Sequence, residues 1–143
     1  MYKIREAKVD DYSMIATIND DPNNIHLANE PPIEKKCFEE VIRAIDRGIY
    51  IVEKSGVMAA FVMFTLNEKE QSIYIQKLSI DKSFQKKGLD EHLYHKVERL
   101  ADARKMEQMV ISLKDDNPDV HDFFVRKGWK RAEQENKYYL ILK

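Results

Sequence analysis

The sequence LSIDKSFQKKGLD, residues 78–90, decides the fold, because a predicted strand turns into a predicted helix within it. The strand covers Ser72 to Asp81, and the helix, from Leu89 to about Lys105, carries apolar residues on one face. The loop between them is basic and contains Gly88. Such a loop at a helix N-terminus presents backbone N–H groups and the positive end of the helix dipole, which suits a phosphate. One glycine and two lysines also fit a plain turn, so the surrounding sequence has to distinguish the two interpretations.

The apolar pattern of this strand changes phase before the loop. Ile73 and Ile75 occupy odd positions, whereas Leu78 and Ile80 occupy even ones. Side chains alternate between the two faces of a regular strand, so the apolar face changes sides between Ile75 and Leu78. A β-bulge inserts one residue and produces this shift. A strand buried on both faces gives the same pattern, and the sequence leaves both alternatives open.

The composition is that of a globular domain. The chain has 143 residues, of which 43% are hydrophobic and 34% charged, so we expect one domain, residues 1–143, around one core. No apolar run approaches the roughly 18 residues of a membrane helix, and the N-terminus lacks the apolar stretch of a signal peptide. The formal net charge of −1 provides no general basic field. We therefore expect neither a membrane nor a nucleic acid as a partner.

Cysteine and histidine usage points to a reducing compartment and to no metal site. The single cysteine, Cys37, cannot form an internal disulfide, which indicates a cytoplasmic protein. It falls on the apolar face of a predicted helix, so we expect it to be buried. The histidines at positions 26, 92, 95 and 121 are scattered, without carboxylate or cysteine partners at chelating spacing.

The predicted elements follow one another in a definite order. They are a strand (2–8), a helix that begins after Asp11, a polar loop (20–32), a helix from Pro32 to Gly48, a three-stranded antiparallel meander (49–54, 57–66 and 72–81), the long helix, an apolar strand (108–113), a short helix from Asn117 and Pro118 to Gly128, a short segment at 129–131 and a last strand (137–142). The inward faces of the shorter helices are predicted to carry Met14, Ile15 and Ile18, then Phe38, Val41, Ile42 and Ile45, then Val120, Phe123 and Phe124. Strand, long helix and strand together imply a right-handed βαβ crossover.

This order resembles the GNAT family of N-acetyltransferases over nearly the whole chain. The two most specific segments are residues 78–90, similar to the acetyl-CoA segment of the family, and NPDVHDFFVRKGW, residues 117–129, similar to its Asn-led helix. The resemblance implies an α+β fold, an α/β/α sandwich. Its central sheet would be mixed and mostly antiparallel, with a bulged strand, a βαβ crossover and helices on both faces. The bulge would splay two parallel strands, and the pantetheine arm of acetyl-CoA would enter the gap between them.

The resemblance also implies the activity, which is transfer of an acetyl group from acetyl-CoA to a primary amine of a small molecule or peptide. The loop would hold the pyrophosphate, a backbone N–H of the splayed strand would polarise the thioester carbonyl, and Asn117 would orient the pantetheine or a water. Gln76 would hydrogen-bond the substrate or a water. The residues expected to bind acetyl-CoA are Leu78, Ser79, Ile80, Gln85, Lys86, Lys87, Gly88, Leu89, Asp90, Asn117, Phe123 and Phe124.

Two residues depart from the family pattern. Phe124 stands where the family usually has a tyrosine that protonates the departing thiolate, and Tyr138, Tyr139 or a water could substitute. Asp90 stands where the family prefers glycine or alanine beside the phosphates, although an acidic residue also complements the positive end of a helix. The alternative to an active enzyme is therefore a weakened or non-catalytic module of this fold, which binds an acyl-CoA or a protein.

The general base and the acceptor are not identified by the sequence. Tyr74 and Gln76 stand where many relatives have a glutamate, and neither is a good base at neutral pH. Glu30 and His26, in the loop ahead of the second helix, could reach the acceptor, or they could simply be solvated. The acidic residues Asp20, Asp21, Glu30 and Glu34 could attract a cationic amine, and the last strand could support a homodimer.

Overall fold

The computed structural model describes residues 2–29, 33–112, 118–131 and 137–142. Its elements are β1 (Tyr2–Glu6), the 3-10 turn η1 (Val9–Asp11), α1 (Tyr12–Asp20), β2 (Ile25–Asn29), α2 (Lys35–Arg43), β3 (Arg47–Lys54), β4 (Val57–Asn67), β5 (Ser72–Ile80), the 3-10 turn η2 (Lys82–Phe84), α3 (Leu89–Ala103), β6 (Gln108–Ser112), α4 (Pro118–Arg126), β7 (Lys130–Arg131) and β8 (Lys137–Ile141).

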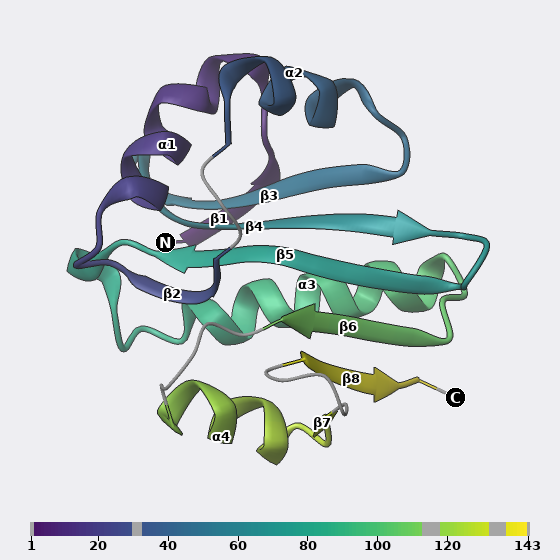
Figure 1. Ribbon diagram of the computed structural model, residues 1–143. Coiled ribbons are helices and arrows are strands. Elements are labelled where there is room, and N and C mark those ends of the chain that lie inside the picture. The colour runs from purple at the N-terminus through teal and green to yellow at the C-terminus, as the bar shows by residue number, and fades with distance from the viewer. Residues whose placement is uncertain (1, 30–32, 113–117, 132–136, 143) are drawn as a thin grey trace.

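The strands form one mixed sheet with helices on both faces. Its order is β1-β3-β4-β5-β6-β8-β7, and β2 pairs with β5 off this path. β5 and β6 are parallel, whereas the other pairs are antiparallel. Figure 1 shows α1 and α2 above the sheet and α3 and α4 on its other side. The expected α+β sandwich with a βαβ crossover is thus confirmed.

Two apolar cores hold the layers together, one on each face of the sheet. Ile15 and Ile18 of α1 and Phe38 and Val41 of α2 pack against the sheet residue Phe61 and its neighbours. The opposite core is larger and joins α3 and α4 to the other face. From α3 it contains Leu89, Leu93, Tyr94, Val97 and Ala101. Because these side chains recur every three or four residues, α3 buries one continuous stripe over the parallel strand pair.

The bulge in β5 is confirmed and lies at Gln76. Ile75 stands opposite Phe64 and Lys77 opposite Met63, so β5 carries one more residue than β4 at this point. Beyond the bulge the strand is also buried on both faces, because Lys77 and Ser79 are as inaccessible as Leu78. The two explanations of the phase change therefore both hold, the bulge at Gln76 and the double burial after it.

The prediction that residues 20–32 form a loop is wrong, because Ile25–Asn29 form β2 on the edge of β5. The second helix was also predicted too long. α2 ends at Arg43, so Ile45 is 91% exposed and Gly48 belongs to β3. Cys37 is exposed rather than buried, since the nine residues of α2 bury only Phe38 and Val41. Met14 is 46% exposed, which places it at the margin of the buried face of α1. The predicted positions of Pro32, Leu113 and Asn117 and the side chain of Val120 lie outside the described residues.

Arg5 links β1 to the 3-10 turn η1, which precedes α1. Its guanidinium donates to both carboxylate oxygens of Asp11, each at 2.8 Å, and to Glu53 on β3 at 3.0 Å. The backbone N–H of Lys8 also donates to Asp11, at 2.7 Å. The guanidinium of Arg5 holds the pKa of the Asp11 carboxyl below its usual value. Ionised Asp11 therefore stabilises the folded state.

We expect Asp11→Asn to lower the free energy of unfolding by about 2 kcal/mol at pH 7, because the hydrogen bonds of a charged group are lost. The stability contributed by Asp11 is fully present above its unfolded pKa of about 3.9 and is lost as pH falls through its lower folded value. Urea unfolding between pH 7 and pH 2.5 should show a flatter acid limb in the variant. Asp10→Asn, at the exposed neighbouring carboxylate, should leave the profile unchanged. Equal profiles for wild type and Asp11→Asn would contradict this assignment.

Candidate active site

The loop between β5 and α3 is shaped by its capping bonds and by two left-handed residues. Asp81 accepts a hydrogen bond from the backbone N–H of Ser83 at 2.8 Å, which starts η2. Lys86 and Gly88 then have φ values of 61° and 76°, and Gly88 is the N-cap of α3. Gln85, Lys86, Lys87 and Gly88 are exposed, so this loop presents its polar groups outward at the start of a helix.

Asp90 already engages one of the donors at the start of α3. Its carboxylate accepts a hydrogen bond from the backbone N–H of Glu91 at 2.9 Å. The first helical bond on this side runs from the N–H of His92 to the carbonyl of Gly88, at 3.1 Å. An anion bound at this helix end therefore meets a carboxylate that caps one N–H group and carries a like charge.

A cavity of about 340 Å³ opens beside this loop. Its lining combines polar residues of the loop, α3 and α4 with apolar residues of β2, β5, η2, α3 and α4. The residues that line it are Ile25, Leu27, Ile80, Phe84, Gln85, Lys86, Gly88, Leu89, Asp90, Phe123 and Arg126. Of the residues expected to bind acetyl-CoA, the cavity brings together Ile80, Gln85, Lys86, Gly88, Leu89, Asp90 and Phe123.

The gap between the two parallel strands is not open. β6 pairs with β5 at residues 72–75, and after the bulge β2 takes the same edge of β5. Figure 1 shows β2 and β6 lying side by side with successive halves of β5. The register pairs Ile25 with Ile80, His26 with Ser79, Ala28 with Leu78 and Asn29 with Lys77. In this conformation β2 occupies that edge of β5, and the expectation that Leu78, Ser79 and Ile80 offer backbone donors to a ligand stays a prediction.

The reason for this arrangement is that buried backbone groups need hydrogen-bonding partners. Once β6 diverges, the second half of β5 has a bare edge inside the molecule, and β2 covers it. The side chain of Leu27 is only 3% exposed and belongs to the core under α3.

His26 holds β2 in place instead of reaching toward an acceptor. Its Nδ1 lies 2.7 Å from the hydroxyl of Ser79, and its Nε2 lies 2.9 Å from the backbone carbonyl of Asp21. The carbonyl can only accept, so Nε2 carries the proton and Nδ1 accepts from Ser79. Asn24 adds a second tie, because its side chain accepts from the backbone N–H of Lys82 at 2.8 Å.

Gln76 does not lie in the cavity but on the polar surface at the bulge. Its amide oxygen accepts a hydrogen bond from the hydroxyl of Thr65 at 2.8 Å. Nearby on the same strand, the hydroxyl of Tyr74 lies 3.1 Å from that of Ser112 on β6. These groups can donate and accept hydrogen bonds, but they are neutral and weakly basic.

Phe124 fills the core and does not face the cavity. Its ring packs against those of Phe123, Tyr94 and Trp129, and it is fully buried. Tyr94 receives a hydrogen bond from the Trp129 indole at 2.9 Å, and burial raises the pKa of Tyr94 to about 12. The phenol of Tyr94 is therefore structural and stays neutral at physiological pH.

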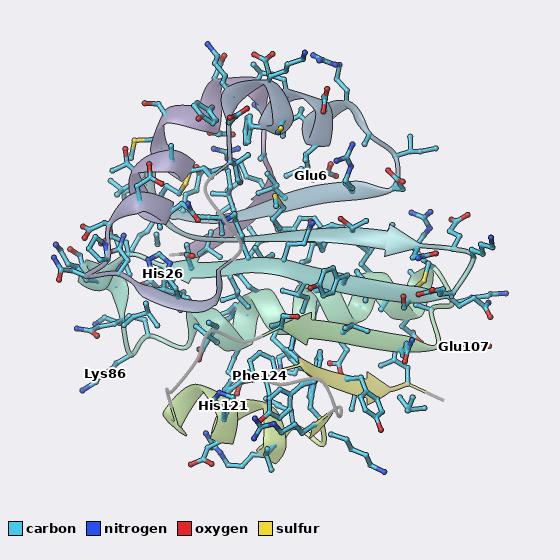
Figure 2. All side chains as sticks on the ribbon, viewed as in Figure 1. Glu6, His26, Lys86, Glu107, His121 and Phe124 are labelled. Atoms are coloured by element: carbon cyan, nitrogen blue, oxygen red, sulfur yellow. The ribbon has the colours of Figure 1, made fainter. Side chains whose placement is uncertain are left out.

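A second phenol lies under α4, where it contacts a histidine. The hydroxyl of Tyr138, on β8, is 2.6 Å from Nδ1 of His121, and Tyr138 is buried. Figure 2 shows His121 and Phe124 on the α4 side of the sheet, with Lys86 on the loop and His26 on β2. Sequence reasoning named Tyr138 as a substitute donor but missed its histidine partner, because the two meet only in the folded chain.

Ile25, Leu27 and Arg126 of the wall were missed, and only Arg126 could have been found. Arg126 follows Phe123 by three residues on α4, so helix periodicity places both on one face. Ile25 and Leu27 depend on β2, which the sequence did not predict. Lys87 and the buried residues Leu78, Ser79 and Phe124 do not line the cavity, and Asn117 lies outside the described residues.

The described residues contain no helix long and apolar enough to span a membrane and no group of three or more side chains suited to hold a metal ion. The cytoplasmic location and the homodimer stay predictions.

Comparison with solved structures finds this fold in many N-acetyltransferases. The ribosomal-protein-S18-alanine N-acetyltransferase of Escherichia coli has a TM-score of 0.80 at 15% identity, covering 100% of this chain and 95% of that one. A mutant of the spermidine N-acetyltransferase of Vibrio cholerae has a TM-score of 0.79 at 15% identity, covering 98% and 93%. The PaiA N-acetyltransferase of Thermoplasma acidophilum, in complex with coenzyme A, has a TM-score of 0.78 at 9% identity, covering 97% and 96%. At these identities the likeness shows the fold alone.

A search of curated proteins finds no match. The model of the acetyltransferase (GNAT) family, however, matches residues 12–129, which include the loop, the cavity and α4. The chain therefore belongs to the GNAT family of acetyltransferases.

Proposed function

We propose that this protein is an acetyl-CoA-dependent N-acetyltransferase that moves an acetyl group to a primary amine of a small molecule or peptide. One observation carries the proposal: the cavity beside the helix end gathers residues from β5, the basic loop, α3 and α4 that were expected to bind acetyl-CoA. Family membership supports the same reaction class.

The residues of the cavity fit the chemistry of this cosubstrate. The N-terminus of α3, Lys86 and Arg126 supply donors and positive charge for a pyrophosphate at one end. Ile80 and Phe123 supply an apolar wall for the pantetheine arm at the other. Acetyl-CoA would bring the acetyl group as an activated thioester, and the chain would hold that thioester against the amine and exclude water from it.

For the acceptor, the family neighbours suggest two classes of amine to test. The spermidine N-acetyltransferase is named for a polyamine, and the ribosomal-protein-S18-alanine N-acetyltransferase for a protein. In this chain Asp20, Asp21 and Glu34 place negative charge around the end of α1 and the start of α2. We propose a cationic amine on this basis, since such charges attract one electrostatically.

The binding of acetyl-CoA and the transfer are tested separately. Titration calorimetry with CoA and acetyl-CoA should show binding below millimolar concentration. Release of CoA thiol should then follow with at least one amine in a panel of polyamines, small amines and N-terminal peptides. Absence of CoA binding up to millimolar concentration would contradict the proposal.

Asp90 should weaken the binding of CoA. At about 8 Å from a phosphate charge and an effective dielectric near 20, its carboxylate costs roughly 2 kcal/mol. We expect Asp90→Asn to tighten CoA binding by about tenfold, measured by calorimetry at low salt. Glu98→Gln, two turns further along α3, makes the same change in net charge and should leave the affinity unchanged. Equal effects of the two variants would show that only the overall charge matters.

We propose that Tyr138, paired with His121, donates the proton that the departing thiolate needs, because Phe124 carries no hydroxyl. Tyr138→Phe should then lower kcat by about 10² to 10⁴ with little change in KM. Tyr139→Phe, at the neighbouring and less buried tyrosine, should keep kcat within about twofold. If Tyr138→Phe keeps full activity, then a water or another group is the donor.

The competing function is a module that binds an acyl-CoA or a protein without transferring a group. The observation that favours it is β2, which lies on the edge of β5 where the arm of acetyl-CoA is expected. CoA binding without thiol release across the whole amine panel would support this alternative, and measurable turnover would eliminate it.

A further inference from the structure

We propose that β2 is a displaceable strap (residues 25–29) that occupies on β5 the place of the pantetheine arm. In this inference, which rests on the proposed function, acetyl-CoA binds fully only when the strap leaves that edge. The nucleotide half of the ligand binds beside the strap, and the pantetheine half competes with it.

The edge of β5 is shared between two strands that cannot both continue along it. β6 pairs with β5 up to Ile75, and the strap begins to pair at Lys77. A strand has two edges, and β4 occupies the other one from Ser72 to Ile80. A pantetheine arm that bonds to the backbone of Leu78 or Ile80 from the gap therefore needs the groups that the strap now covers.

The attachment of the strap is short and interrupted, which suits a segment that can leave. The register shifts between His26 and Ala28, so the ladder of five residues contains an irregularity at Leu27. Besides the ladder, the strap is held by the bond between His26 and Ser79 and by the buried side chain of Leu27. A short, interrupted ladder has few backbone hydrogen bonds to break, and segments with few such bonds open more readily than the core strands.

The cavity is lined both by loop residues, beside which the nucleotide half would bind, and by strap residues, with which the pantetheine half would compete. Lys86 and Gly88 form its polar end, which is accessible with the strap in place. Ile25 and Leu27 form part of its apolar wall, whereas Leu78 behind them is fully buried. Departure of the strap would therefore extend the cavity along β5 toward Leu78, in the direction of the bulge.

Competition with the strap weakens the apparent affinity for the whole ligand, CoA, but not the affinity for its nucleotide half. The apparent dissociation constant of CoA equals the intrinsic one divided by the fraction of molecules with the strap released. The dissociation constant of 3′-phospho-ADP, which lacks the arm, is independent of that fraction. The ratio of the two affinities thus reports the position of the strap.

A reversible cross-link between His26→Cys and Ser79→Cys, in a Cys37→Ser background, locks the strap on β5. The two side chains already touch across directly paired positions, which suits a disulfide. In the oxidised protein CoA should bind no more tightly than 3′-phospho-ADP, and reduction of the same protein should restore at least about tenfold tighter binding of CoA. Thiol titration verifies that the cross-link has formed. A second pair, Lys54→Cys and Val57→Cys beside the β3–β4 turn, controls for oxidation and should have no effect.

The outcomes separate the two hypotheses. If CoA and 3′-phospho-ADP each bind, and the affinity for CoA is equal in the oxidised and reduced protein, the strap proposal is overturned and the proposed function stays intact. The arm would then lie elsewhere, for example along the outer edge of β2. Binding of neither ligand in either state would overturn the proposed function and the strap with it.

Truncation of the strap anchor gives an independent test that needs no cross-link. Leu27→Ala should lower the thermal stability of the protein and nevertheless tighten CoA binding by about tenfold, because the strapped state loses a buried side chain. The affinity for 3′-phospho-ADP should not change. Leu66→Ala, the same truncation in the same core and at similar burial, should lower stability without tightening CoA binding. Unchanged or weaker CoA binding in a folded Leu27→Ala variant would overturn the proposal.

Discussion

The arrangement of the whole molecule around its cavity depends on the one-residue bulge at Gln76. The extra residue reverses which face each later side chain of β5 occupies. Beyond it Leu78 and Ile80 join the core under α3, while Ser79 stands opposite Phe61 in the core under α1 and α2. The bulge also ends the pairing with β6, which continues only up to Ile75. Beyond this residue β5 is buried on both faces, and one of its edges lacks β6.

That edge cannot remain bare, and this requirement connects β2 to the proposed ligand site. An unpaired backbone group inside the protein costs about as much as a lost hydrogen bond, and a half-strand has several such groups. In this structure β2 satisfies them, with His26 bonded to Ser79 and Leu27 packed into the core. Any ligand that uses the same groups gains only the difference between its own bonds and those of β2. In the proposed function β2 is thus a part of the binding site, although it precedes the loop between β5 and α3 by some 50 residues.

The elements that could be predicted from the sequence are those whose signal is local. The apolar stripe of α3, the phase change in β5 and the glycine-containing loop each lie within a few adjacent residues, and all were found where expected. β2 has no such signal. Its five residues include His26, they follow a polar segment with Pro22, and they form a strand because of the edge that they meet. Strand formation at such a site is decided by tertiary contacts, so the polar composition was interpreted as a loop.

The same distinction applies to the proposed catalytic groups. The absence of a hydroxyl at Phe124 is visible in the sequence, but the proposed substitute is not, because Tyr138 gains its partner His121 only through the pairing of β6 with β8 and the packing of α4. Cys37 and Ile45 illustrate the converse case. Ile45 lies beyond Arg43, where α2 ends, whereas Cys37 lies within α2 but away from the face that buries Phe38 and Val41, so both side chains lie at the surface.

Three features of this chain share one physical effect on ligand binding. Asp90 caps an N–H group at the helix end, β2 covers the edge of β5, and Phe124 completes a buried aromatic cluster in place of the family's tyrosine. In each case a group that a ligand would engage already has a partner within the protein. These internal contacts stabilise the free protein. They also reduce the affinity for a ligand, because they must be broken before the ligand can engage the same groups. In the proposed function, the affinity for acetyl-CoA is therefore set as much by the strength of these internal contacts as by the contacts that acetyl-CoA makes.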